Sequence, residues 1–179
     1  SLVTASAIVG GKAETSGPLR EITSPHDRRA IIGAVREADE GAVSRAMTAA
    51  AAAQQEWDQQ GGEARAAILD RAADLYEANT ERLIALLVRE AGKSLDNAVA
   101  DLREAVDFLR YYANRARADF AGPVLLPGPT GERNEMSLHG RGVFACIAPW
   151  NFPVAIFTGQ VAAALAAGNS VVAKPAEQT

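Results

Sequence analysis

Apolar residues recur at helical spacing through the middle of the chain. The series at residues 43–57 predicts a first helix, and the Gly61-Gly62 pair interrupts the pattern after it. A second series, at residues 68–88, predicts one continuous helix that Gly92 ends. Ser94 is a suitable N-cap for a third helix, because its hydroxyl can accept a hydrogen bond from a free N–H of the first turn.

The third helix carries a regular apolar stripe. Its positions are Leu95, Val99, Leu102, Val106, Leu109 and Ala113. Their alternating spacing of four and three residues predicts one buried face. A coiled-coil or adaptor helix would show the same stripe, and a non-catalytic helical interaction module is therefore kept as an alternative. The run lacks the length of a sustained heptad array, which favours the core of a globular domain.

Two regions before and after the helices have the composition of extended chain. Residues 1–37 contain short β-prone pieces at 7–9 and 30–32, separated by Gly and Pro, and this punctuation predicts strands or a hairpin. Residues 121–131 include three prolines and three glycines, which predict a loop. Residues 134–139 alternate partly and predict an exposed strand.

The C-terminal part changes to a strand, helix and strand pattern. Residues 142–148 are uninterrupted and apolar, as expected of a strand that is buried on both faces of a parallel sheet. Residues 153–167 predict a helix and residues 170–173 a second strand, so the three elements form a right-handed βαβ crossover. The predicted buried positions of this helix are Ile156, Phe157, Val161, Ala164 and Leu165.

These elements place the chain in the α/β class. A lone parallel pair with one covering helix is an incomplete sheet, so we expect the sheet to continue beyond Thr179. The composition, 48% hydrophobic and 22% charged, is that of a globular protein rather than a disordered or collagen-like one. The net charge of -4, with both signs interspersed, offers no broad field for nucleic acid or anionic lipid.

Location is predicted from what the sequence lacks. No apolar stretch reaches the roughly 18 residues of a membrane span, and residues 1–11 do not have the pattern of a secretory signal. The single cysteine, Cys146, excludes an internal disulfide, as suits a reducing compartment. We therefore expect a cytoplasmic protein without direct membrane insertion.

Candidate chemistry lies at the carboxyl ends of the two C-terminal strands, where open α/β sheets bind ligands. The first strand is not followed by Gly-x-Gly-x-x-Gly, which excludes that dinucleotide fingerprint there. The turn at residues 149–153 carries Asn151, whose amide can donate to an oxyanion. An Asn just before a helix is also a favoured cap, and on the residues alone the cap is the more common role.

Neighbouring residues also have two interpretations each. Trp150 and Phe152 can line a pocket or belong to the core. Lys174 and Glu177 can hydrogen-bond ribose hydroxyls, or can be a solvated Lys and a first-turn Glu that the helix dipole favours. Cys146 lies mid-strand among apolar residues, which indicates an inert packing role rather than a nucleophile.

Other titratable residues predict no further site. His26 and His139 are isolated in the sequence, and no spacing suggests a metal centre. Asp101 and Glu104 lie three residues apart on the third helix and share one face, for which a solvated position is the default interpretation.

The segments Gly142–Pro153 and Ala163–Thr179 resemble the aldehyde dehydrogenase superfamily. The predicted helical segment Arg103–Ala113 resembles one branch of this superfamily in particular. That branch is the glutamate-semialdehyde (pyrroline-5-carboxylate) dehydrogenase module of bifunctional bacterial proline utilization A. The resemblance covers essentially the whole chain but only the N-terminal portion of the family's domain. Another semialdehyde or aldehyde dehydrogenase on the same scaffold is the alternative.

The resemblance implies a domain organisation. Residues 1–121 would supply N-terminal strands and helices of the cofactor-binding domain, and residues 122–141 an oligomerisation hairpin. Residues 142–179 would form the first βαβ unit of a variant Rossmann NAD-binding domain, which stays incomplete here. The whole protein is expected to oxidise glutamate γ-semialdehyde to glutamate with NAD, as a homo-oligomer, with a possible proline dehydrogenase domain before Ser1.

The resemblance also implies roles for single residues. Asn151 matches the family's oxyanion donor, which reverses the preference for a cap. The cofactor-binding positions are Ile147, Ala148, Pro149, Trp150, Lys174 and Glu177. A carboxylate at Glu177 disfavours the extra phosphate of NADP, so NAD is the expected cofactor. Phe152 matches an aromatic wall of the aldehyde tunnel, and Glu104 matches a helix carboxylate near the aldehyde site.

One departure limits these expectations. The family's catalytic cysteine, its general-base glutamate and its pyrophosphate glycines would all lie downstream of Thr179, and Cys146 does not match the nucleophile. We therefore expect residues 1–179 to have no dehydrogenase activity by themselves.

Overall fold

A computed structural model describes residues 3–179 of the chain. Ser1 and Leu2, which begin the predicted segment 1–121, lie outside the described residues. The elements in chain order are β1 (Val3–Ser6), β2 (Ile8–Val9), β3 (Lys12–Ala13), β4 (Leu19–Thr23), β5 (Ile31–Arg36), α1 (Glu40–Gln59), α2 (Gly61–Ala78), α3 (Thr80–Glu90), α4 (Leu95–Asp119), β6 (Val124–Leu126), β7 (Asn134–Met136), β8 (Val143–Ile147), α5 (Ala155–Ala166) and β9 (Ser170–Lys174).

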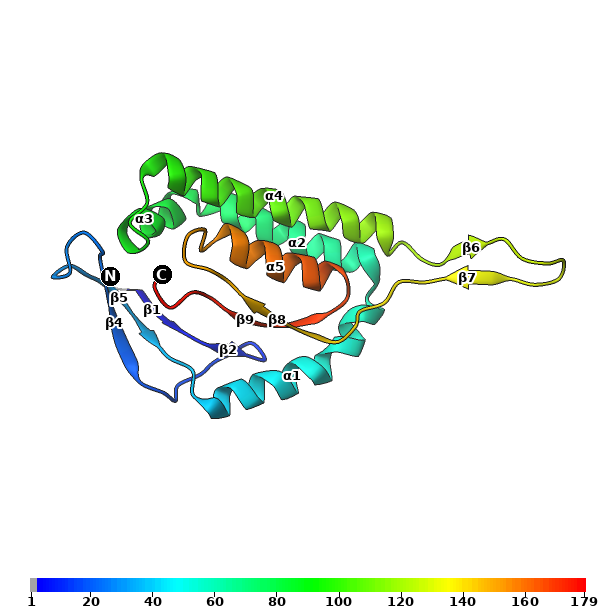
Figure 1. Cartoon of the computed structure of the whole chain (residues 1–179), viewed down its shortest axis with the longest axis horizontal. Helices are drawn as coiled ribbons and strands as arrows, with labels where there is room; N and C mark the ends of the chain where they lie inside the picture. The colour runs from blue at the N-terminus through cyan, green and yellow to red at the C-terminus, as the bar shows by residue number, and fades with distance from the viewer. Residues whose placement is uncertain (1–2) are drawn as a thin grey trace.

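The elements form a layer of helices over short sheets (Figure 1). Helices α2, α4 and α5 pack together, and the parallel pair β8–β9 contacts α5 and also α1. A three-stranded sheet of order β1-β5-β4 lies toward the end of the molecule opposite the β6–β7 hairpin, which projects away from the body. No helix within residues 3–179 has both the length and the apolar character needed to cross a membrane.

The predicted extended N-terminus is confirmed, with more strands than expected. Strands β2 and β3 form a tight hairpin whose turn is Gly10-Gly11, with φ angles of 55° and 77° that suit glycine. The β-prone pieces at 7–9 and 30–32 correspond to β2 and the start of β5. Strands β1 and β4, which flank β5, have no strong alternation in sequence and were not predicted.

The helix breaks follow local chemistry. The break between α1 and α2 occurs at Gln60, beside the predicted glycine pair, where Gly61 has a φ of 80°. The predicted continuous helix over residues 68–88 is wrong, because α2 ends at Ala78 and α3 begins at Thr80. Asn79 leaves the helical conformation and its Nδ2 donates to the Leu75 carbonyl at 2.8 Å. Asn competes with helical hydrogen bonding in this way, which explains the break.

The start of α4 confirms two local predictions. Gly92 has a φ of 68° and follows the end of α3, as a helix stop should. Ser94 is the N-cap of α4, and its hydroxyl accepts from the Asn97 N–H at 3.4 Å.

The predicted stripe of α4 is only partly buried. Leu102, Leu109 and Ala113 are buried, whereas Leu95 and Val99 are 63% and 38% exposed. The buried face consists mostly of small residues, because α2 and α5 approach α4 closely. The buried residues of this core are Ala66, Leu69, Ala73, Leu109, Ala113, Ala116, Ala162 and Ala166.

The crossover unit is confirmed, with corrections to its burial. Strands β8 and β9 pair in parallel, and α5 connects them. However, Phe144 and Ile147 on β8 are 44% and 66% exposed, so the expectation of burial on both faces is wrong for the described residues. Of the five predicted buried positions of α5, Ala164 is buried, whereas Ile156, Phe157, Val161 and Leu165 are half-buried. The helix buries small residues instead, among them Gly159 and Ala162.

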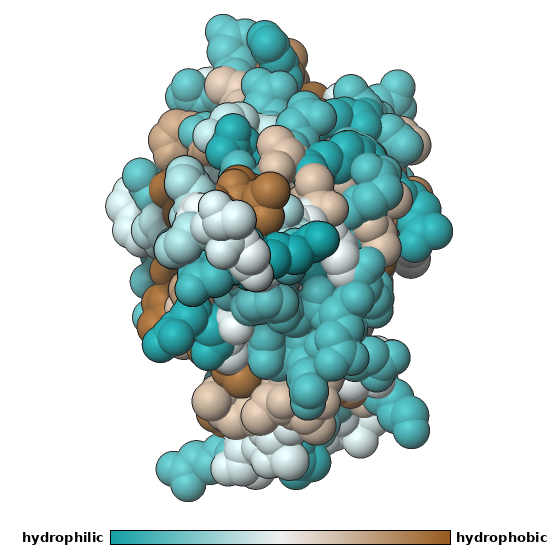
Figure 2. Space-filling model, turned by 90° about the vertical axis from the view of Figure 1, so that its right-hand side faces the viewer, coloured by the Kyte–Doolittle hydropathy of each residue, from teal (hydrophilic) through white to brown (hydrophobic). Residues whose placement is uncertain are grey.

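The hairpin occupies the segment that composition predicted to be a loop. Strand β6 lies inside residues 121–131 and pairs antiparallel with β7, which confirms the expected exposed strand. Val124, Leu125 and Met136 are each about half exposed or more. Figure 2 views the molecule from the hairpin side and shows brown apolar surface among polar residues. The structure thus contains a hairpin within 122–141, and its role in oligomerisation stays a prediction.

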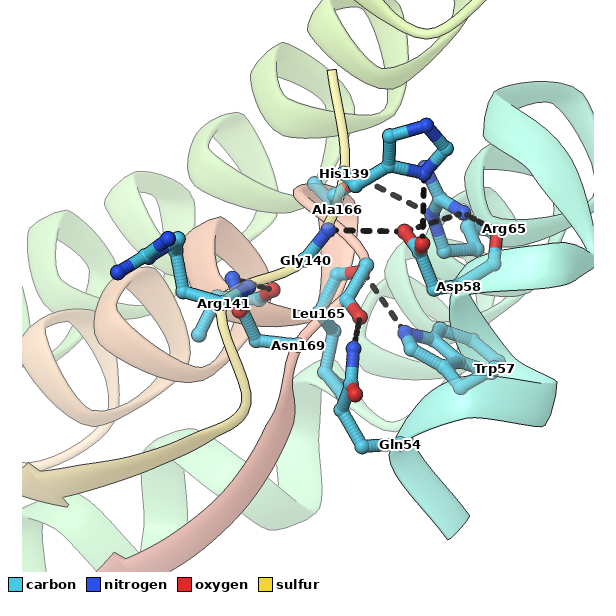
Figure 3. Close-up of polar contacts among 12 residues, drawn as sticks. Gln54, Trp57, Asp58, Arg65, His139, Gly140, Arg141, Leu165, Ala166 and Asn169 are labelled. Carbon is cyan, nitrogen blue, oxygen red and sulfur yellow. Dashed lines mark hydrogen bonds and ion pairs between the residues drawn. The ribbon is translucent and has the colours of Figure 1, made fainter. Parts of the chain in front are cut away.

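A polar network fixes the chain where it leaves the hairpin and enters β8 (Figure 3). Asp58, at the end of α1, accepts from the Gly140 N–H at 2.9 Å and lies 3.0 Å from His139 Nδ1. Asn169 Oδ1, just before β9, accepts from the Arg141 and Gly142 N–H groups. The starts of β8 and β9 are therefore held together by Asn169. This contact fixes the register of the two strands and so the position of their carboxyl ends.

The same network ties α1 and α2 to the end of α5 (Figure 3). Gln54 and Trp57 donate to the carbonyls of Gly168 and Leu165 at 3.0 and 2.9 Å. Arg65 is 1% exposed, and its Nε donates to the Ala166 carbonyl at 3.1 Å. The Ala166 carbonyl lies in the last turn of α5, where carbonyls lack an intrahelical partner. The Leu165 carbonyl also accepts from the Gly168 N–H at 3.1 Å, and Gly168 lies beyond the helix.

Candidate functional site

The carboxyl ends of β8 and β9 meet at one edge. Ile147 and Lys174 are register partners, and the Ala148 N–H donates to the Lys174 carbonyl at 3.1 Å beyond the last paired residue. The turn at 148–154 and the segment at 175–179 therefore leave the sheet side by side. This confirms that Asn151 and Lys174 belong to the same edge of the sheet, as the crossover topology requires.

Asn151 lies in the turn with its side chain exposed. Helix α5 begins four residues later, at Ala155, and its N-cap position is Val154, which makes no side-chain cap. The cap interpretation of Asn151 is therefore wrong. The turn is closed instead by its own backbone, because the Ile156 N–H donates to the Phe152 carbonyl at 3.1 Å. The Asn151 side chain is thus exposed and does not cap α5.

The cap of α5 comes from another helix. Asp101 of α4 is fully buried, and its Oδ1 accepts from the Ala155 N–H at 2.8 Å. Its Oδ2 lies 3.1 Å from Lys93 Nζ, and the Lys93 side chain is only 10% exposed. The predicted solvated face is wrong for Asp101, because its position on α4 turns inward toward α5. Glu104, one turn further along, is exposed as expected.

The aromatic residues of the turn differ in their surroundings. Phe152 is 36% exposed, and Lys93 Nζ lies 4.2 Å from the centroid of its ring, within the range of a cation–π contact. Trp150 is 63% exposed. Neither ring is a core residue in the described chain, so the core interpretation of Trp150 and Phe152 is wrong.

The residues on the β9 side are open and polar. Lys174 and Glu177 are exposed. The Glu177 carbonyl accepts from Arg20 Nη2 at 3.1 Å, which ties this segment to β4, and the Glu177 carboxylate accepts from Gln178 Nε2 at 3.4 Å. Exposed donors and acceptors at a strand end fit the hydroxyls of a ribose. On the β8 side, Ile147 and Pro149 are exposed, whereas Ala148 is buried.

Cys146 has the predicted packing role. Its side chain is 5% exposed, and burial raises the pKa of its thiol. A buried thiol with a raised pKa is a poor nucleophile at neutral pH.

An open groove of about 520 Å³ runs along the free edge of β8 and the adjoining face of α5. It is lined by Phe144, Ala145, Cys146, Ile147, Gln160, Ala163, Ala164, Ala167 and Asn169. Ile147, the last residue of β8, lines this groove, so the groove reaches the carboxyl end of that strand, whereas Asn151 and Lys174 do not line it. No group of three or more His, Cys, Asp or Glu side chains within residues 3–179 is arranged to hold a metal ion.

A family model described as the aldehyde dehydrogenase family matches residues 12–179. The chain belongs to the aldehyde dehydrogenase family. Its relatives also confirm the resemblance to the branch that contains proline utilization A and pyrroline-5-carboxylate dehydrogenase. The bifunctional protein PutA of Escherichia coli (strain K12) is 49% identical over 164 residues, which cover 92% of this chain and 11% of that protein.

The 1-pyrroline-5-carboxylate dehydrogenase 2 of Bacillus subtilis (strain 168) is 39% identical over 172 residues, which cover 96% of this chain and 33% of that protein. The chain therefore spans about a third or less of the length of these relatives.

Solved structures confirm the α/β fold. The proline utilization A of Bdellovibrio bacteriovorus superposes with a TM-score of 0.93 at 40% identity, over 98% of this chain and 18% of that one. A 1-pyrroline-5-carboxylate dehydrogenase from Thermus with bound NAD superposes with a TM-score of 0.94 at 35% identity, over 99% of this chain and 34% of that one. Residues 3–179 thus have the architecture of the N-terminal portion of the aldehyde dehydrogenase fold.

Sequence reasoning missed the buried pair of Lys93 and Asp101. One signal was present: Asp101 stands between the apolar positions Ala98, Leu102 and Ala105 of α4, on the inward side of the helix. Lys93 had no comparable signal, because a Lys after a helix stop is ordinarily solvated. Only the packing of α5 against α4 brings the pair to the turn that carries Asn151.

Proposed function

We propose that residues 1–179 form the N-terminal part of an NAD-dependent dehydrogenase that oxidises glutamate γ-semialdehyde, the open form of 1-pyrroline-5-carboxylate, to glutamate in proline catabolism. The observation that carries the proposal is the Asn151 amide, exposed at the carboxyl end of β8 and relieved of any capping role by Asp101. Relatives that match nearly the whole chain bear the names PutA and 1-pyrroline-5-carboxylate dehydrogenase.

Asn151 is the proposed oxyanion donor. When a thiolate adds to the aldehyde carbonyl, the carbonyl oxygen becomes negatively charged, and the Asn151 amide N–H donates to it. A donor fixed in advance at this position is worth about 10²–10³ in kcat. The nucleophile is not Cys146, whose burial and raised pKa disqualify it, so the thiol comes from a part of the protein outside residues 1–179.

The β9 side is the proposed dinucleotide site. NAD, when bound, supplies the hydride acceptor of the reaction. Lys174 and Glu177 hydrogen-bond the adenosine ribose hydroxyls, and the Glu177 carboxylate repels a 2′-phosphate, which selects NAD over NADP. The end of β8 and its turn, Ile147, Ala148, Pro149 and Trp150, line the cofactor.

The aldehyde lies on the other side of Asn151 in this proposal. Phe152 forms an aromatic wall of its tunnel, and the exposed Glu104 carboxylate of α4 faces the substrate site. The proposed whole protein acts in the cytoplasm as a homo-oligomer through the hairpin at 122–141. A proline dehydrogenase domain that precedes these residues would supply the semialdehyde, as the similarity to PutA suggests.

The test uses the protein of the complete reading frame that contains these residues. NADH formation is followed with glutamate γ-semialdehyde and with a simple aliphatic aldehyde, for the wild type and for Asn151→Ala. We expect preferential turnover of the semialdehyde and a kcat about 10²–10³ lower in Asn151→Ala.

The matched control is Asn114→Ala, which removes an exposed amide from α4 and should leave kcat unchanged. Turnover of the aliphatic aldehyde alone would retain the family and reject this substrate. Absence of NADH with either aldehyde, from a folded protein, would reject the dehydrogenase proposal and favour a non-catalytic role.

A further inference from the structure

We propose that Lys93 and Asp101 are positioning residues, which hold the turn that carries Asn151 and Phe152 in the geometry that the reaction needs. The inference rests on the proposed function of Asn151. It is carried by three contacts: Asp101 Oδ1 to the Ala155 N–H at 2.8 Å, Asp101 Oδ2 to Lys93 Nζ at 3.1 Å, and Lys93 Nζ to the Phe152 ring centroid at 4.2 Å.

Asp101 is an unusual residue for its position. Its side chain is fully buried between α4 and the start of α5, where the neighbouring positions of α4 are Ala98, Leu102 and Ala105. Burial of a carboxylate is costly even when it is paired, and well-packed apolar residues in place of a buried ion pair are often as stable or more stable. Stability alone therefore does not account for a charge at this position, whereas a geometric role does.

The carboxylate fixes where α5 begins. It accepts from the first N–H of the helix and places a negative charge at the positive end of the helix dipole. Because the Ile156 N–H also donates to the Phe152 carbonyl, the start of α5 and the end of the turn move as one unit. Asp101 thus anchors the turn from its α5 side.

Lys93 fixes the aromatic residue of the same turn. Its backbone is itself held, because Gly92 turns the chain with a φ of 68° and the Lys93 N–H donates to the Leu87 carbonyl at 3.3 Å. From this point the ammonium reaches both the Asp101 carboxylate and the face of the Phe152 ring. A cation held against one ring face limits how far that side chain moves.

The turn that carries Asn151 is therefore held on both sides. On the β8 side, the Ala148 N–H is bound to the Lys174 carbonyl, and on the α5 side the Lys93–Asp101 pair holds Phe152 and Ala155. A displacement of about 1 Å in a reacting geometry can cost on the order of 10²-fold in rate. The pair therefore acts on the oxyanion donor through its neighbours, without touching substrate.

The central variant is Lys93→Met with Asp101→Asn in the protein of the complete reading frame. Met replaces the Lys stem without its charge, and Asn keeps an oxygen that can accept from the Ala155 N–H. Because both charges leave together, neither stays buried and unpaired, and the fold should persist. The matched control is Asp107→Asn, the same change at an exposed position of α4.

Two measurements are made on each variant: steady-state kinetics with glutamate γ-semialdehyde and NAD, and hydrogen–deuterium exchange followed by mass spectrometry. We expect kcat to fall by about 10–100-fold and the KM for NAD to change by less than about fivefold, because of the proposed cofactor residues only Trp150 lies within residues 150–156, whereas Lys174 and Glu177 lie on the β9 side. Exchange should rise in peptides that cover residues 150–156 and stay unchanged in α1 and α2. Asp107→Asn should match the wild type in both measurements.

A kcat within twofold of the wild type in the double variant would overturn the inference, whatever the exchange shows. A rise in exchange throughout the chain, with a lower Tm, would overturn it in favour of a general structural role. If the wild type itself turns over neither aldehyde, the proposed function fails, and unchanged exchange at 150–156 in the double variant would separately show that the pair does not hold the turn.

Discussion

At the scale of single residues, the turn that carries Asn151 is held by side chains from elsewhere in the chain, Asp101 of α4 and Lys93 before it. Gly92, Ser94 and Cys146 have the roles expected of them, because a helix stop, an N-cap and an apolar strand position depend on the residues immediately around them. Asp101 was expected in solvent and is fully buried. On the residues alone, Asn151 is the expected cap of α5, and in the structure Asp101 provides that cap instead.

Asp58 provides a pH-dependent prediction at this scale. Burial alone raises its pKa, but the hydrogen bond from the Gly140 N–H, the contact with His139 and the Arg65 charge outweigh burial and lower the pKa overall. A carboxylate with a lowered folded-state pKa stabilises the fold above its unfolded pKa of about 3.9. This contribution is lost as the pH falls through the lower folded-state value.

We therefore expect Asp58→Asn to lower the free energy of unfolding at pH 7 by roughly 1 kcal/mol. The difference from the wild type should shrink below about pH 4. Urea unfolding of residues 1–179 at pH 7 and at successively lower pH measures both values, with Asp107→Asn as the exposed control. A difference that stays constant down to pH 2 would contradict the assigned role of the charge.

At the scale of elements, the helical regions and the start of α4 at Ser94 were predicted, but the division between α2 and α3 was not. The period of apolar residues identifies a helix, but Asn79 divides one predicted helix into α2 and α3 through a side-chain hydrogen bond. Helix α5 was expected to bury its large residues and instead buries small ones. The reason is that α4 and α2 approach it closely, and this distance is set by residues far away in the sequence.

Gly62 tests the close approach of α2 and α4. A Cβ at this position would lie 2.1 Å from the Ala116 carbonyl oxygen and 2.9 Å from that of Phe120, both of which are backbone atoms. Gly62→Ala therefore forces the helices apart, and we expect a loss of about 2–3 kcal/mol in the free energy of unfolding. Thermal unfolding should show this as a Tm lower by several degrees.

Gly41→Ala is the matched control, because a Cβ there would meet only the side-chain ends of Arg45 and Asp39. Alanine also has the higher helix propensity, so this variant should be as stable as the wild type or slightly more stable. Equal Tm values for the two variants would show that the α2–α4 contact is more adaptable than the structure indicates.

At the scale of the whole molecule, the β6–β7 hairpin is the feature that projects from the body. Strands β6 and β7 project from the body, and Val124, Leu125 and Leu126 expose 55%, 68% and 42% of their surface. A run of exposed apolar residues on a projecting hairpin is typical of an interaction surface. This supports the proposed homo-oligomer.

We expect Leu125→Glu in the protein of the complete reading frame to weaken self-association by at least tenfold, because it places a charge in a desolvated contact. Analytical ultracentrifugation over a range of concentrations measures the effect. Thr130→Glu, at the exposed tip of the same hairpin, is the control for added charge alone. An unchanged oligomer in Leu125→Glu would exclude the hairpin as the interface.

The sequence by itself determined which regions are helical, the βαβ crossover and the family, because periodicity and the residues around Asn151 and Lys174 are local properties of the chain. It also placed both residues at strand ends, since parallel strands joined by one crossover share that edge. Only the tertiary structure decided that Asp101 is buried and caps α5, and that Lys93 lies over Phe152. The Asp101 contact joins α4 to the start of α5 about fifty residues later. Long-range packing of this kind produces no periodic pattern in the sequence of either segment.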